Sequence, residues 1–146
     1  MQRCAAAALA GLLLAACAPL PPEERPGPER TRTVALGFDE TWRRVLDSVA
    51  DEGIPLKEVA RESGVLYAEG LIPRNPALAD CGRGRSWSAL PQTALAVNVF
   101  VRPDGSGTRV TVNARYTQMY ASGLDQRFVL CRSTGALEER IFAALR

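Results

Sequence analysis

The side chains best able to do chemistry in this sequence are its four cysteines, Cys4, Cys17, Cys81 and Cys131. A cysteine nucleophile needs a neighbouring base to activate it, and a zinc site needs about four thiolate, imidazole or carboxylate ligands. The chain has no histidine, and none of its cysteines has the Cys-x-x-Cys spacing of redox thiols. We therefore expect no catalytic residue, no metal and no cofactor.

Other candidate motifs do not supply a reaction either. The acidic pairs Glu23-Glu24, Asp51-Glu52 and Glu138-Glu139 fall in a linker or on expected helix surfaces. The glycines of residues 104–107 lack the Gly-Lys-Ser/Thr of a phosphate-binding loop, so we interpret this segment as a turn. A hydrolase is the function class with the least support.

Cys17 stands at the end of an apolar segment. Residues 4–16 contain only apolar residues, counting cysteine and glycine, and they follow the positive charge of Arg3. This layout is typical of a secretory signal. The segment is shorter than the roughly twenty residues that a transmembrane helix needs. Leu14-Ala15-Ala16-Cys17 resembles the lipobox of bacterial lipoproteins, whose cysteine receives a diacylglycerol, becomes the N-terminus after cleavage and is usually N-acylated. The resemblance implies a membrane anchor at Cys17.

The residue after this cysteine carries a sorting signal in the same family. Ala18 stands there in place of the aspartate that retains many lipoproteins at the inner membrane. In a Gram-negative cell this implies an outer-membrane lipoprotein that faces the periplasm. The alternative is an ordinary secretory signal that is cleaved near a cysteine by chance.

Composition divides the chain into a signal over 1–16, a lipidated tether over 17–30 and one globular domain over 31–146. The tether holds five of the ten prolines, so we expect an extended spacer. The net charge of +2 is too small for a nucleic-acid partner. Cys81 and Cys131 remain in the mature domain, and an exported compartment permits disulfides, so we expect these two to pair.

Hydrophobic periodicity predicts strands and two helices in the domain. The expected elements are a strand over 31–36, a helix from Phe38 to Gly53, a hairpin of 54–60 with 65–72, a long exposed loop over 73–91, a hairpin of 93–102 with 108–117, an irregular connection over 118–126, a strand over 127–132 and a terminal helix. Pro55 predicts that its strand begins late or lies at an edge.

Each helix has an apolar stripe at helical spacing, which is typical of core packing. The first stripe comprises Phe38, Trp42, Val45, Leu46 and Val49, and the second comprises Leu137, Ile141, Ala144 and Leu145. We expect Asp39 to cap the first helix, and Ser133 or Thr134 to cap the second.

This order predicts an α+β fold, with an antiparallel sheet of about four to five strands and two helices packed on one face. The pattern around Phe38, Trp42, residues 63–65 and the terminal helix resembles the small domains of BamC, an accessory of outer-membrane assembly, and of related helix-grip lipoproteins. The resemblance covers roughly 31–146 and implies partner binding without catalysis.

Two surfaces are candidates for contact with an envelope protein partner. One is the loop that carries Arg83, Arg85 and Trp87, and the other is the polar sheet face around Phe100. The loop has the alternative interpretation of a solvated segment with Trp87 folded over the domain edge. The leading hypothesis is a non-enzymatic, lipid-anchored partner-binding protein. The alternative is a carrier or sensor of a small apolar ligand held between sheet and helices.

Overall fold

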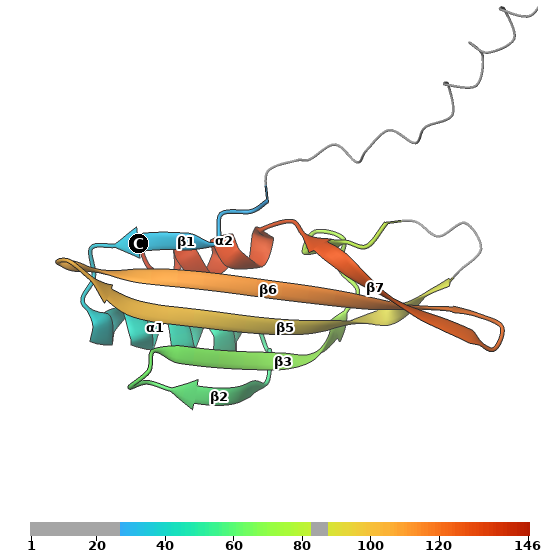
Figure 1. Cartoon of the computed structure of the whole chain (residues 1–146), viewed down its shortest axis with the longest axis horizontal. Helices are drawn as coiled ribbons and strands as arrows, with labels where there is room; N and C mark the ends of the chain where they lie inside the picture. The colour runs from blue at the N-terminus through green and yellow to red at the C-terminus, as the bar shows by residue number, and fades with distance from the viewer. Residues whose placement is uncertain (1–26, 83–87) are drawn as a thin grey trace, which may run out of the picture.

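A seven-stranded sheet forms the body of the domain, and two helices lie behind it in Figure 1. The computed structural model describes residues 27–82 and 88–146. The elements are β1 (Thr31–Val34), α1 (Phe38–Asp51), β2 (Leu56–Ala60), β3 (Val65–Pro73), β4 (Ala79–Asp80), β5 (Ser88–Asp104), β6 (Gly107–Ser122), β7 (Asp125–Ser133) and α2 (Ala136–Ala143). None of the described helices is long and apolar enough to span a bilayer.

All strand pairings are antiparallel, and the strand order is β2-β3-β5-β6-β7-β4, with β1 beside the first half of β6. The α+β class and the antiparallel sheet are confirmed. Strand β2 begins after Pro55 and forms an edge, as the proline predicts. The sheet has seven strands where about four to five are expected, because all six strand segments of the sequence join it and β4 is added from the expected loop.

The expected loop over 73–91 contains the short β4 and the beginning of β5. Residues 88–104 form one strand despite Pro91, because the register with β6 shifts between Ala89 and Thr93. A proline cannot donate to the ladder, so it fits at such an irregularity. The loop is therefore shorter than the sequence suggests, and Leu78 and Ala79 within it are buried.

The expected irregular connection over 118–126 is instead a hairpin. Strand β6 continues to Ser122 and pairs with β7 from Asp125 onward, with Gly123 at a φ of +61° in the turn. Glycine adopts this left-handed conformation without the strain that a side chain brings. The β6–β7 hairpin extends well beyond the helices in Figure 1.

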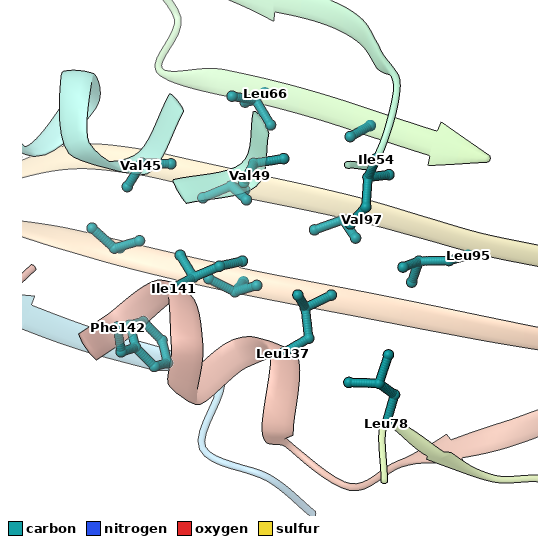
Figure 2. Packing of buried hydrophobic residues seen from close by; sticks show 14 of the residues in the cluster. Val45, Val49, Ile54, Leu66, Leu78, Leu95, Val97, Leu137, Ile141 and Phe142 are labelled. Atoms are coloured by element: carbon teal, nitrogen blue, oxygen red, sulfur yellow. The ribbon is translucent and has the colours of Figure 1, made fainter. Parts of the chain in front are cut away.

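The core fills the space between the helices and one face of the sheet. Figure 2 shows side chains from α1 and α2 meeting Leu95 and Val97 of β5. Trp42, Val45 and Val49 are buried, and Phe38 and Leu46 pack against them, as the first stripe predicts. In α2 the stripe is partly wrong. Ala144 is exposed and Phe142 is buried, because Phe142 faces β1 and receives Arg32 over its ring.

The helix caps differ from those expected. Gly37 and Gly135 occupy the two N-cap positions, and neither supplies a side-chain cap. Asp39 lies in the first turn of α1 and forms an ion pair with Arg61 at 2.5 Å. The hydroxyl of Ser133 accepts a hydrogen bond from the backbone amide of Gly135 at 3.1 Å. Ser133 therefore supports the start of α2 from a position two residues before the N-cap.

One acidic side chain assigned to the helix surface is instead buried. Glu138 is 1 % exposed and accepts a hydrogen bond from the Ser133 hydroxyl at 2.9 Å. It lies in the first turn of α2, where the positive end of the helix dipole favours a carboxylate. Its neighbour Glu139 is exposed, as expected, and pairs with Arg32 at 3.0 Å.

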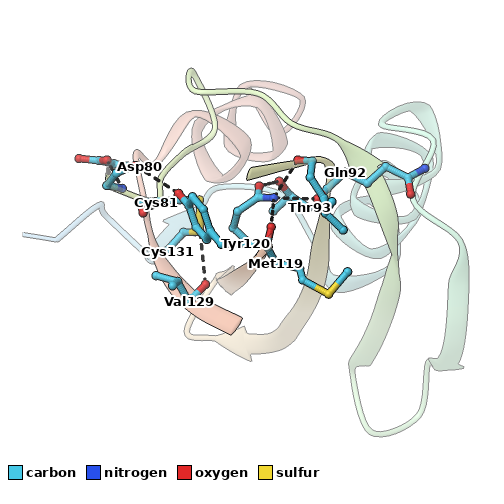
Figure 3. The surroundings of a disulfide bond; sticks show 11 residues. Asp80, Cys81, Gln92, Thr93, Met119, Tyr120, Val129 and Cys131 are labelled. Atoms are coloured by element: carbon cyan, nitrogen blue, oxygen red, sulfur yellow. Dashed lines mark hydrogen bonds between the residues drawn. A yellow bond between two sulfur atoms is a disulfide. The ribbon is translucent and has the colours of Figure 1, made fainter. Parts of the chain in front are cut away.

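Figure 3 shows where the disulfide ties the sheet to the segment before β5. Cys81 follows β4 and Cys131 lies in β7, with the two sulfur atoms 2.03 Å apart, as expected from the sequence. The Tyr120 hydroxyl lies 3.1 Å from the carbonyl oxygen of Cys81 and 3.2 Å from that of Gly82. The same end of the sheet is therefore held by a covalent bond and by a buried tyrosine.

Two tyrosines of β6 provide a matched test of buried polar groups. The Tyr116 hydroxyl is buried without a hydrogen-bond partner among the described residues, whereas that of Tyr120 is partnered. We expect Tyr116→Phe to leave the free energy of unfolding unchanged or raise it by up to about 1 kcal/mol, and Tyr120→Phe to lower it by about 1 kcal/mol. Denaturant titration at neutral pH measures both, and equal losses would contradict the assignment.

The buried Tyr116 hydroxyl also predicts that the free energy of unfolding depends on pH. Burial, and secondarily the carboxylate of Glu138, raise the pKa of Tyr116 above its ordinary value of 10.0. Above pH 10 the unfolded chain therefore loses this proton more readily than the folded chain, and stability falls as pH rises. In Tyr116→Phe this loss is absent, so its advantage over the unmodified chain should grow above pH 10.

Candidate partner-binding face

The sequence-predicted site residues fall into two groups. Cys17, Arg83, Arg85 and Trp87 lie outside the described residues. Phe100 lies in β5 on the sheet face opposite the helices, which we call the open face. There it is partly buried, in register with Val65 of β3 and Thr111 of β6.

The open face carries large apolar side chains in the part of the sheet where β6 pairs with β7. Leu71 of β3 is in register with Ala94 of β5, Ala94 with Thr117 of β6, and Thr117 with Leu130 of β7. Directly paired residues point to the same face, so this row crosses four strands. Leu71 is 67 % exposed and Leu130 is 68 % exposed.

The next register pair on this face joins one exposed side chain and one partly buried side chain. Phe128 of β7 is 72 % exposed and is in register with Met119 of β6. Phe128 is two residues from Leu130 and therefore shares its face. We call Leu71, Phe128 and Leu130 the apolar end of the open face.

A hollow of about 300 Å³ opens on this face beside the apolar end. Its lining comprises Lys57, Glu69, Gly70, Leu71, Ala94, Leu95, Ala96, Arg115 and Thr117. The floor lies low because Ala94 and Ala96 have small side chains, and the longer side chains of Leu71 and the charged residues stand around it.

The charges around the hollow are unequal. Lys57 and Arg115 form no ion pair within the described part of the chain, whereas Glu69 accepts a hydrogen bond from the Tyr67 hydroxyl. That hydrogen bond raises the pKa of Tyr67. Two cations thus face one carboxylate that already has a partner, and the hollow is suited to bind an anionic group.

The arrangement offers a binding surface. Within residues 27–82 and 88–146 no three histidine, cysteine, aspartate or glutamate side chains gather as metal ligands would. What the open face presents is exposed apolar area, a concave hollow and two cationic groups. These are the components of a recognition site for another molecule.

Sequence reasoning placed one aromatic on this face and missed its apolar end. Leu71 alternates with buried positions of β3, so its exposure depends on which face the helices cover. The sequence predicts the short strand that carries Phe128 and Leu130, but not which strand it pairs with or which face of the sheet these side chains occupy. No protein-family model and no curated protein sequence matches this chain.

Proposed function

We propose that this chain is a non-enzymatic lipoprotein of the cell envelope, anchored by a lipid on Cys17, whose domain binds a protein partner through its open face. The anchor rests on the resemblance of residues 14–17 to a lipobox. Outer-membrane attachment facing the periplasm follows from Ala18 in the sorting position. The tether then presents the domain at a distance from the lipid.

Partner binding rests on the apolar end. Three large apolar side chains, exposed by 67 %, 72 % and 68 %, share the sheet face that the helices leave uncovered. They add nothing to the core, which lies on the other face. Large apolar side chains exposed on one otherwise polar face are characteristic of a protein interaction site.

The packing favours this proposal over carriage of an apolar ligand between sheet and helices. That ligand site would need space beside Trp42 and Val97, and both belong to the cluster of buried side chains between sheet and helices (Figure 2), whereas neither lines the hollow found among the described residues. The hollow lined by Ala94 and Ala96 opens on the opposite face.

A photo-crosslinking residue tests the partner surface in intact cells. We expect the residue at position 71 or 130 to trap the same protein, and at Glu62, an exposed position in the β2–β3 turn, to trap only background. Leu130→Asp should abolish the cross-link formed from position 71. Equal labelling from all three positions, or no labelling from 71 and 130, would refute the open face as the binding surface.

Replacing Cys17 tests the anchor separately. We expect Cys17→Ser to move the protein from the membrane fraction to the soluble fraction, while the domain keeps its circular dichroism spectrum. Cys4→Ser is the matched control, because Cys4 lies within the signal and should leave fractionation unchanged. Retention of the Cys17→Ser protein in membranes would overturn the anchor.

A further inference from the structure

We propose that the hollow beside the apolar end receives an apolar side chain from an acidic segment of the protein partner. This rests on the proposed function and adds the chemistry of the partner. The hollow selects by shape through its alanine floor, and by charge through Lys57 and Arg115.

The shape suits a side chain better than a free small molecule. A volume of about 300 Å³ is at the lower limit of sites that enclose small ligands, and this hollow is open to solvent. The exposed row from Leu71 to Leu130 continues past it across the sheet. Leu71, Ala94 and Thr117 of this row line the hollow, so an occupant that fills only the hollow would leave Leu130 and Phe128 in water, whereas a protein segment covers both.

The charges define the sign of that segment. Several arginines of the domain have carboxylate partners, such as Arg109 with Asp104 at 3.0 Å and Arg140 with Glu52 at 2.8 Å. Lys57 and Arg115 have no such ion pair among the described residues, although both line the hollow. Complementary charge determines which partner binds more than how tightly it binds.

The local structure holds both cations at the hollow. Lys57 lies in β2 where the register with β3 shifts between Leu56 and Glu58. Arg115 lies in β6 in register with Ala96 of the floor, which is in turn in register with Glu69. The two basic groups thus stand on opposite sides of the alanines, and a bound carboxylate can meet either one.

Selection from a library of random twelve-residue peptides displayed on phage tests this proposal, with the full chain in nonionic detergent as the target. We expect the recovered peptides to combine a large apolar residue with adjacent aspartate or glutamate. K57E/R115E should reverse the preference toward lysine and arginine, and should weaken a recovered acidic peptide by about tenfold. R74E/R102E makes the same change of net charge outside the hollow and should leave affinity unchanged.

Ala96→Trp tests the shape, because its side chain fills the hollow from the floor. Ala96 faces outward, so we expect an unchanged unfolding midpoint and a loss of peptide binding of about tenfold or more. A peptide set without acidic preference, no recovered peptides, or equal binding to K57E/R115E would overturn the proposal. Vesicles of phosphatidylglycerol provide the competing outcome, and binding to them that requires Lys57 and Arg115 would assign the hollow to lipid instead.

The two proposals fail separately. If cross-links form from positions 71 and 130 but the charge reversal has no effect on peptides, the open face binds a partner and only the acidic chemistry is wrong. If the cross-links are absent, the partner surface itself is wrong.

Discussion

Replacing both Cys81 and Cys131 with serine is expected to lower the free energy of unfolding by about 4 kcal/mol. The disulfide joins residues 50 apart in sequence, so its loss restores a large conformational freedom to the unfolded chain. Denaturant unfolding of the oxidised protein and of the double variant measures the difference.

The control is the unmodified protein in excess reductant, which should match the double variant. A loss below about 1 kcal/mol would show that the unfolded chain is already restricted near these residues. We also expect faster hydrogen exchange at the amide of Thr134, which donates to Leu78 at 3.0 Å. Strand β4 forms only two register pairs with β7, so the covalent bond supports a weak local contact.

Gln118→Met is expected to lower the free energy of unfolding by about 3 kcal/mol. The Gln118 side chain is fully buried. Its amide nitrogen donates to the carbonyl oxygens of Leu90 at 2.9 Å and Gln92 at 3.1 Å, and its oxygen accepts from the Thr93 hydroxyl at 2.7 Å. Methionine has a similar shape but cannot donate, so the carbonyls of Leu90 and Gln92 would lose this donor and the Thr93 hydroxyl would lose its acceptor.

Gln126→Met is the matched control, because Gln126 is exposed in β7. The same chemical change there should alter the free energy of unfolding by less than about 0.5 kcal/mol. Comparable losses in the two variants would contradict the role of Gln118. The carbonyls it meets flank Pro91, so this glutamine stabilises the irregular part of β5 that a proline creates.

The strands and helices with regular apolar spacing could be predicted from the sequence. In β5 the alternate positions from Leu95 to Val101 are buried, and in β6 Val110, Val112 and Tyr116 are buried while Ala114 packs against them, as a period of two predicts. The first helix likewise places Trp42, Val45 and Val49 in the core. Here local pattern and tertiary packing agree.

The missed parts of the fold depend on contacts between distant residues. A proline at 91 and a glutamine at 118 each argue against strand structure, yet both lie in paired strands, β5 and β6, and the glutamine bonds the carbonyls beside the proline. Glu138 resembles a surface residue of a helix until Ser133 is placed beside it. Such pairings leave no periodic signal.

The candidate site was predictable only in part. Phe100 follows from the alternation of its strand, and it lies on the open face as expected. The apolar end needs the register of β3, β5, β6 and β7 to bring Leu71 and Leu130 into one row, because 59 residues of sequence separate them. The gathering of Lys57, Glu69 and Arg115 around the hollow likewise depends on how the strands pair.

The first described residues have a mechanical consequence. The backbone amide of Val112 donates to the carbonyl of Arg30 at 2.8 Å, β1 then forms four register pairs with β6, and Arg32 lies 4.5 Å from the centre of the Phe142 ring. Tension applied to the chain before Gly27 therefore reaches the sheet and α2 at once. When the pull runs along β1, these contacts share the load and must break together, so the domain can bear force at Gly27, where the described chain begins.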